Sequence, residues 1–271
     1  MPSSSSPLYI VTGATGGIGG AVAEALARQG QSLVLACRDS RRAALKVQEL
    51  TAATGNTDIQ ALTLDLSSFD AVRRFVSSLQ QLQRPVAALV NVAGAMSRRS
   101  SVTADGFELD FQVNCLSTAL LSRLVAPLMV AGGHIIFTTS VTRKIWNLPS
   151  SFPREPHFSQ LGTYGRSKLA LTIFAHHFAQ AVQSQDIRVA CADPGVVNTG
   201  MISMHRWFDC LADIFFRPFI STPAQGARPM LRALTDTATC RLHSCSSSGP
   251  LVLRKRWEEA LPLVLAAVPN A

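Results

Sequence analysis

The feature that most restricts the fold of this chain is an alternation of short apolar runs with longer segments of helical period. The first run, Leu8 to Thr12, precedes a helical segment, Gly17 to Gln29, and Gly30 follows where a helix would end. The same order repeats, with predicted strands at 32–36, 59–64, 86–90, 134–139 and 187–192 and predicted helices at 41–53, 69–82, 107–129 and 163–182. A bend is expected in the third of these later helices, near Pro127.

Strands that are apolar on both faces and separated by helices indicate a parallel sheet covered on both sides. The predicted fold class is therefore α/β, with a single doubly wound parallel sheet of the Rossmann type. Ligands of such sheets bind beyond the carboxyl ends of the strands. The length of 271 residues suits one domain, 1–271, with a variable tail at about 241–271. Within the tail, 251–253 suggests an edge strand and 257–268 a helix broken at Pro262.

Composition excludes several other classes of protein. Hydrophobic residues make up 47% and charged residues 15%, which does not suit a disordered chain. The net charge of +8 comes mostly from scattered Arg, so no nucleic-acid partner is expected. The N-terminus lacks a signal-peptide pattern and no apolar run is long enough to span a membrane, which predicts a cytoplasmic location. The six Cys form no C-x-x-C pair, and His176 and His177 have no nearby partners for a metal, so no metal site is expected.

A glycine-rich loop follows the first strand directly and opens the first helix. Glycine permits a tight turn and a close approach of the backbone to a pyrophosphate, and the helix N-terminus offers free N–H groups to it. An ordinary strand-to-helix turn is the alternative, but the position after the first strand favours a dinucleotide site. The candidate residues are Gly13, Thr15, Gly16, Gly17, Ile18 and Gly19.

The end of the second strand carries the signal for the type of dinucleotide. NAD-binding chains usually place an acid there, whereas this chain has Cys37 followed by Arg38. A guanidinium suits a ribose 2′-phosphate, so NADP (NADPH) is predicted and NAD is less favoured. Two alternatives remain open: Arg38 as a solvated loop charge, and Asp39 turned inward to hold NAD.

Tyr164 and Lys168 are four residues apart on a predicted helix and therefore share a face. An exposed helical pair is the simpler interpretation, but the helix follows a strand and loop that end at Ser140. Together these side chains suit carbonyl reduction or its reverse, in which a nicotinamide moves hydride and oxygen exchanges a proton. An ammonium is expected to lower the pKa of the neighbouring phenol, and Ser140 to donate to the substrate oxygen.

These ordered motifs resemble the short-chain dehydrogenase/reductase family over roughly residues 8 to 235. They are the glycine loop, Asp65-Leu66, Asn91-Val92-Ala93-Gly94, Asn114, Ser140, Tyr164 with Lys168, and Pro194-Gly195 with Thr199. The resemblance implies that Asp65 contacts the adenine, that Asn91 to Gly94 line the cofactor cleft and that Thr199 binds the carboxamide or a phosphate. It also implies that Asn114 holds a water that relays protons to Lys168, although spacing alone favours a helix-packing amide.

The chain departs from the common family pattern in two places. Val92 stands where the family usually has a second Asn, for which a small effect is expected. The gap of 24 residues from Ser140 to Tyr164 is longer than in many members. Three features of the chain resemble the branch of retinol dehydrogenases, the WW-domain oxidoreductase and protochlorophyllide reductase. They are this longer gap, the A-C-R-D sequence after the second strand and the segment 222–227.

Two segments are expected to wall the substrate pocket, and both are rich in aromatic residues. They are 141–163, with Trp146, Phe152 and Phe158, and a segment at about 201–220. The family resemblance implies that the second segment closes over the substrate as a lid. Their content predicts a hydrophobic alcohol, ketone or aldehyde as substrate. A packed or subunit-buried helix, or shallow membrane contact flanked by Arg206 and Arg217, are the alternatives for the lid.

The leading prediction for the whole chain is an NADP-dependent oxidoreductase. A non-catalytic dinucleotide-binding sensor or scaffold is the second candidate, and a membrane-surface or nucleic-acid binder a distant third. The family resemblance also implies a homo-oligomer formed through the helices at Asn114 and Tyr164.

Overall fold

The computed structural model describes residues 6–154, 157–195 and 221–270. Its sheet has eight strands in the order β3-β2-β1-β4-β5-β6-β7-β8, parallel throughout except for β8. The strands are β1 Leu8–Thr12, β2 Ser32–Cys37, β3 Ile59–Thr63, β4 Val86–Asn91, β5 Met129–Thr138, β6 Arg188–Asp193, β7 Arg241–Ser244 and β8 Ser248–Pro250. The chain winds outward from β1 in one direction and, after β3, returns to continue in the other, which confirms the predicted doubly wound α/β class.

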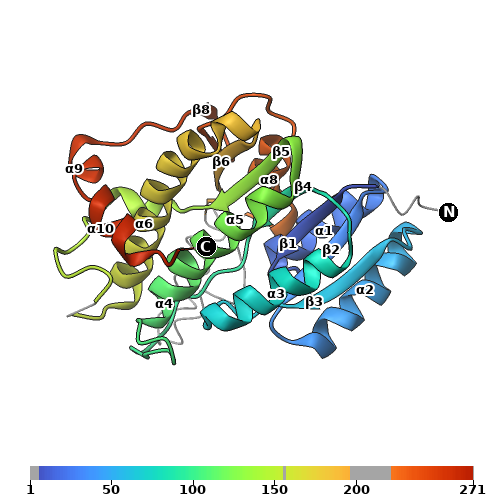
Figure 1. Ribbon diagram of the computed structural model, residues 1–271, viewed down its shortest axis with the longest axis horizontal. Helices are drawn as coiled ribbons and strands as arrows, with labels where there is room; N and C mark the ends of the chain where they lie inside the picture. The colour runs from blue at the N-terminus through green and yellow to red at the C-terminus, as the bar shows by residue number, and fades with distance from the viewer. Residues whose placement is uncertain (1–5, 155–156, 196–220, 271) are drawn as a thin grey trace.

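Helices cover both faces of this sheet (Figure 1). One face carries α1 (Gly17–Arg28), α2 (Ser40–Thr54) and α8 (Pro223–Ala233), and the other carries α3 (Phe69–Gln81), α5 (Ser117–Val125) and α6 (Gln160–Ala181). The short helices α9 (Lys255–Glu258) and α10 (Leu261–Ala267) lie outside α6.

Alternation within the strands explains why both faces are covered. In β5, Ile135 and Phe137 pack into the core beneath α5 and α6, whereas Ile136 packs into the core beneath α1 and α8. Successive strand side chains point to opposite faces, so a strand that is apolar at every position must be buried on both.

The predicted helix at 107–129 is interrupted in the structure. It consists of α4 (Leu109–Phe111), a π-helical turn η1 (Gln112–Leu116), α5 and a 3₁₀ turn η2 (Ala126–Leu128). Near Pro127 the helix ends in the 3₁₀ turn instead of bending, and β5 begins at Met129 rather than at His134. The π turn holds Asn114, whose side chain bonds to the backbone of a separate loop, so tertiary contacts decide its geometry.

The predicted edge strand at 251–253 is wrong. The sheet instead ends in a hairpin, in which β7 pairs with β6 and β8 turns back along β7. Leu251 and Leu253 are buried against the core beyond this hairpin. The helix expected at 257–268 is present in two parts, α9 and α10, with Pro262 in the first turn of the second, where its missing N–H needs no partner.

Candidate active site

A cavity of about 470 Å³ lies at the carboxyl ends of β1, β2 and β4, where the chain changes its winding direction. This switch point is where doubly wound sheets bind their ligands. The predicted residues that line the cavity are Gly13, Thr15, Gly16, Gly17, Ile18, Gly19, Arg38, Asp65, Leu66, Ala93 and Gly94. Residues from four separate segments of the sequence therefore meet at one place.

The glycine loop has the geometry that close approach to a phosphate requires. Gly13 has a φ of +67°, and a Cβ there would lie 3.0 Å from Ala93 Cα. A Cβ on Gly19 would overlap the Gly13 carbonyl. The N-cap of α1 is Gly16, which has no side chain to accept hydrogen bonds from the N–H groups of the first turn. These N–H groups can therefore donate to a phosphate. The loop therefore fits the pyrophosphate of a dinucleotide.

The end of β2 presents two guanidinium groups to the cavity. Arg38 and Arg42 both line it, and Arg42 Nη2 also donates to Thr15 O at 3.4 Å. Asp39 is the N-cap of α2, where its carboxylate accepts from Arg42 N at 3.0 Å. The carboxylate is thus engaged at the helix terminus, and Arg42 is a cavity residue that the sequence analysis missed. Its position one helical turn after the end of β2 was the available signal.

Thr12 organises the loop after β4. Its hydroxyl oxygen accepts from the N–H groups of Val92 and Ala93, both at 3.0 Å. Asn91 is buried beside this loop and donates to Ser122 Oγ at 3.3 Å, and it does not line the cavity. Asp65 does line it, with one oxygen accepting from Ser67 N at 2.9 Å and Ser67 Oγ at 2.7 Å.

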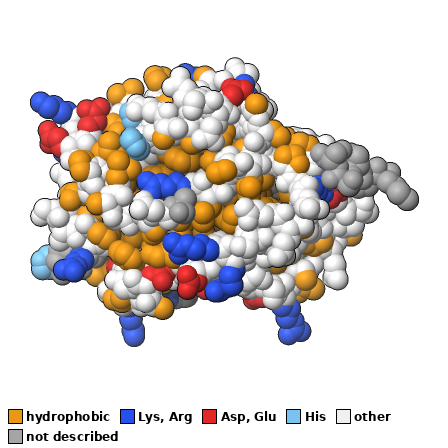
Figure 2. Space-filling model, in the orientation of Figure 1, with side chains coloured by type: hydrophobic (Ala, Val, Ile, Leu, Met, Phe, Trp, Pro, Cys, Tyr) orange, Lys and Arg blue, Asp and Glu red, His pale blue; other side chains and the backbone are white. Residues whose placement is uncertain are grey.

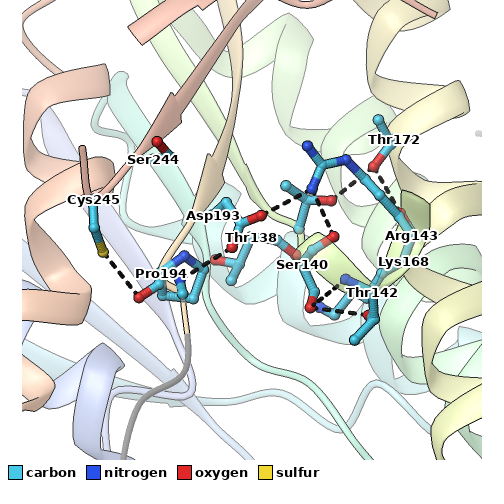
Figure 3. A network of polar contacts seen from close by, with 12 residues as sticks. Thr138, Ser140, Thr142, Arg143, Lys168, Thr172, Asp193, Pro194, Ser244 and Cys245 are labelled. Atoms are coloured by element: carbon cyan, nitrogen blue, oxygen red, sulfur yellow. Dashed lines mark hydrogen bonds and ion pairs between the residues drawn. The ribbon is translucent and has the colours of Figure 1, made fainter. Parts of the chain in front are cut away.

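Tyr164, Ser140 and Lys168 come together between the end of β5 and the first half of α6. Ser140 Oγ accepts from Thr142 N at 3.3 Å and from Thr142 Oγ1 at 3.0 Å (Figure 3). Both of its lone pairs are then used, so its single proton remains for its hydrogen bond with Tyr164. Lys168 is 2% exposed, donates to Thr138 O at 2.9 Å and lies 5.7 Å from the centroid of the Tyr164 ring.

The titration of these groups differs from the prediction. Burial, together with the carboxylates of Asp193 and Asp110, raises the pKa of Tyr164 to about 12, and the hydrogen bond from Ser140 acts in the opposite direction. Burial lowers the pKa of Lys168 to about 8. The phenol is therefore less acidic than expected, and a lowering of its pKa by Lys168 stays a prediction.

Asn114 is buried and its amide has three partners. Its oxygen accepts from Ala95 N at 2.7 Å, and its nitrogen donates to Ala95 O and Ser167 Oγ, both at 2.8 Å. The side chain thereby ties the loop after β4 to α6. Gly94 lies beside it, since a Cβ there would meet Asn114 Oδ1 at 3.1 Å and Lys168 Nζ at 3.4 Å. The side chain has the packing role that spacing alone favoured, and the relay role stays a prediction.

Three charged residues near the phenol were not assigned to the site by the sequence analysis. Asp110 is fully buried and accepts from Ser97 N and Oγ, the latter at 2.6 Å. Arg143 and Asp193 form a buried ion pair at 2.9 Å. Asp193 also accepts from Gly195 N at 3.1 Å, at the turn that follows β6. Asp110 could have been found in the sequence because it lies four residues before Asn114, on the same face of a predicted helix.

Other predicted residues lie elsewhere. Pro194 and Gly195 follow β6 and do not line the cavity, and Thr199 and the lid 201–220 lie outside the described residues. Phe152 is 5% exposed and packs edge-on against Phe111, so it belongs to the core rather than to a pocket wall.

No group of His, Cys, Asp or Glu in the described ranges could hold a metal ion. Among the same residues, no helix has the length and apolar character needed to cross a bilayer.

Comparisons with known proteins identify the family of this chain. The family model for short chain dehydrogenases matches residues 8–207. Retinol dehydrogenase 12 from Homo sapiens is 31% identical over 227 residues, which cover 83% of this chain and 72% of that protein. Polyprenol dehydrogenase from Mus musculus is 33% identical over 243 residues, covering 86% and 72%.

Solved structures share the fold. A short-chain dehydrogenase from Sphingobium yanoikuyae in complex with NADPH has a TM-score of 0.69 and 24% identity, over 98% of this chain and 97% of that one. L-sorbose reductase from Gluconobacter frateurii, complexed with NADPH and L-sorbose, has a TM-score of 0.70 and 22% identity, over 89% and 95%. With its glycine loop and its Ser-Tyr-Lys cluster, the chain belongs to the short-chain dehydrogenase/reductase family of NAD(P)-dependent oxidoreductases.

Proposed function

We propose that this protein is an NADP-dependent oxidoreductase that interconverts a hydrophobic alcohol and its ketone or aldehyde, with Tyr164 as general acid/base. The observation that carries the proposal is the cluster of Ser140, Tyr164 and Lys168, which adjoins the dinucleotide cavity: Lys168 Nζ and the cavity residue Gly94 are neighbours. A protein that only binds a dinucleotide has no need of these three side chains in contact.

Each residue of the cluster has a distinct part in the reaction. A bound nicotinamide supplies or accepts the hydride. Tyr164 holds its proton firmly, since burial raises the pKa of its hydroxyl to about 12. An alkoxide that forms from a carbonyl is still more basic than this phenol, so Tyr164 can donate to it. The arrangement suits reduction better than oxidation, which would need the phenolate.

Ser140 and Lys168 support this proton transfer. Ser140 directs its proton towards the phenol oxygen and thereby stabilises negative charge there. Lys168 is protonated below about pH 8, its pKa being lowered by burial, and as a buried cation it favours the anionic oxygen that forms nearby. Asn114, through its contacts to Ala95 and Ser167, holds the loop after β4 against α6.

The preference for NADP rests on the end of β2. Arg38 and Arg42 both face the cavity, whereas the Asp39 carboxylate caps α2. Two guanidinium groups suit a 2′-phosphate, and an engaged carboxylate is poorly placed to accept from a ribose hydroxyl. Structural neighbours in complex with NADPH support the same choice.

A hydrophobic substrate is supported by the aromatic content of the segment 201–220 and by relatives named for retinol and polyprenol, two apolar alcohols. A homo-oligomer stays a prediction from the family resemblance; hydrophobic side chains and basic groups are interspersed on the face drawn in Figure 2. The single-domain organisation, the part played by Thr199 and a cytoplasmic location stay predictions from the sequence.

The test is consumption of NADPH by the purified protein against a panel of apolar ketones and aldehydes. Tyr164→Phe should abolish turnover and leave NADPH binding nearly unchanged. The chain has two tyrosines, so Tyr9→Phe in β1 is the matched control and should stay active. An active Tyr164→Phe protein would show that the acid is misassigned. A wild-type protein that binds NADPH but reduces no carbonyl would favour the sensor or scaffold alternative.

A further inference from the structure

A buried ion pair lies directly behind Ser140. Arg143, in the 3₁₀ turn η3 (Val141–Lys144), contacts Asp193, the last residue of β6, through Nη1 and Oδ2 at 2.9 Å (Figure 3). The two side chains are only 4% and 10% exposed. Such a pair contributes little net stability, since desolvation of both charges offsets most of their attraction. Its surroundings indicate another role.

Arg143 holds the backbone of Ser140. The Ser140 carbonyl accepts from Arg143 Nη1 at 2.6 Å and also from Arg143 N at 3.1 Å. Thr142, between them in sequence, donates twice to Ser140 Oγ. Ser140 is therefore held at both its carbonyl and its hydroxyl, and this restraint directs its proton towards Tyr164.

Asp193 reaches the same site from β6. Its second oxygen accepts from Gly195 N at 3.1 Å, which fixes the turn after the strand. The next carbonyl in this turn, Pro194 O, accepts from Cys245 Sγ at 3.1 Å. The ion pair thus joins the ends of β5 and β6 behind the proposed acid.

The charges that face Tyr164 come from four elements. Asp193 at the end of β6 and Asp110 on α4 both raise the pKa of the phenol, and Lys168 lies on the same helix as Tyr164. Two buried thiols, Cys115 and Cys191, face Lys168 with their pKa values raised to about 12 by burial, so they stay neutral. Arg143 is in direct contact with Asp193, and its positive charge offsets the field of that carboxylate.

We propose that Arg143 and Asp193 are positioning residues for the acid/base step, in which Arg143 fixes Ser140 and its charge offsets the Asp193 carboxylate that faces the Tyr164 phenol. The inference rests on the proposed function of Tyr164. It assigns roles to two residues that the cofactor cavity does not include. Removal of either charge should therefore change the acidity of the phenol, and in opposite directions.

The test measures the titration of Tyr164 without turnover. In a Tyr9→Phe background Tyr164 is the only tyrosine, so a fluorinated tyrosine supplied during expression gives one ¹⁹F signal. Fluorination makes the phenol more acidic and brings its titration into a range where the fold is stable. The ¹⁹F shift is followed against pH for the background protein, Asp193→Asn, Arg143→Met and the double variant.

Asp193→Asn should lower the midpoint by about one pH unit and Arg143→Met should raise it by a similar amount, with the double variant close to the background. Arg143→Lys keeps the positive charge and should titrate with the midpoint of the background protein. This variant also tests the inference if Arg143→Met does not fold. Arg84→Met is the matched control, because Arg84 pairs with Asp58 at 2.9 Å at the opposite edge of the sheet. It should leave the midpoint unchanged.

Activity adds a second readout. Arg143→Met should lower kcat by about tenfold or more, with little change in KM for NADPH, because the acid/base step is affected and dinucleotide binding is not. Midpoints that stay fixed, or that move in the same direction in Asp193→Asn and Arg143→Met, would overturn the inference. An inactive wild-type protein would instead refute the proposed function, and the ¹⁹F result distinguishes the two failures.

Discussion

Replacement of Lys168 by Met should make the protein more stable near neutral pH and inactive. Lys168 is 2% exposed, and burial lowers its pKa from 10.5 to about 8. Each pKa unit corresponds to about 1.4 kcal/mol, so below pH 8 the charged amine lowers the free energy of unfolding by about 3 kcal/mol. Loss of its bond to Thr138 O removes about 1–2 kcal/mol. The net expectation is a gain of about 1–2 kcal/mol.

The pH dependence gives this prediction its sign. Between about pH 8 and 10.5 the unfolded chain keeps the Lys168 proton and the folded protein has lost it, so wild-type stability rises with pH through this window. Below the window both states are protonated and the penalty is fully present. Above it both are neutral and the penalty disappears. The advantage of Lys168→Met should therefore shrink steadily as the pH rises from 8 to 10.5.

Urea denaturation across this pH range, without added dinucleotide, measures the difference in the free energy of unfolding. Lys255→Met is the matched control, since Lys255 is exposed at the start of α9, and its stability should follow the wild type. A Lys168→Met protein that is less stable than the wild type near pH 7, or whose advantage does not depend on pH, would refute the reasoning.

Four further results are expected. Arg38→Ala should weaken NADPH binding by about tenfold or more and NADH binding much less, as measured by fluorescence titration. Equal losses of affinity for the two dinucleotides would show that Arg38 does not contact the 2′-phosphate. Gly19→Ala should abolish dinucleotide binding in calorimetry, because its Cβ would overlap a loop carbonyl, whereas Gly249→Ala has open space and should bind normally. The rate of carbonyl reduction should not fall through ionisation of Tyr164 at any pH well below about 12, and the rate of alcohol oxidation should rise with pH. A reduction rate that falls and an oxidation rate that does not rise over this range would contradict the role of Tyr164. Phe152→Ala should lower the free energy of unfolding by about 3–5 kcal/mol. An unchanged free energy of unfolding together with a raised KM for the substrate would show that Phe152 lines the substrate pocket.

The doubly wound class of the sheet and the position of the glycine loop could be predicted because they depend on local patterns. The period of apolar residues separates strands from helices, and a parallel sheet then follows from strands that are apolar on both faces. The glycine loop could be identified because a short spacing in the sequence fixes a turn at the end of the first strand. The hairpin at 241–250 carried no such pattern, so the edge strand was placed too late in the chain.

The electrostatics of the site could not be predicted from spacing. Tyr164 and Lys168 share a helix face, as their separation requires, but the ammonium bonds to Thr138 O and lies by the ring. The acidity of the phenol depends on its burial and on carboxylates contributed by α4 and β6, whose distances from it exist only in the folded chain.

The sequence by itself determined which residue types are available and in which elements they lie: a glycine loop before α1, Arg38 after β2, and a tyrosine and lysine one turn apart. Only the tertiary structure decided that Asp39 caps α2 and that Arg143 contacts Asp193 behind Ser140. The physical reason is that hydrogen bonds and charge interactions depend on distance and burial in space, which residues far apart in the chain acquire only when the sheet assembles.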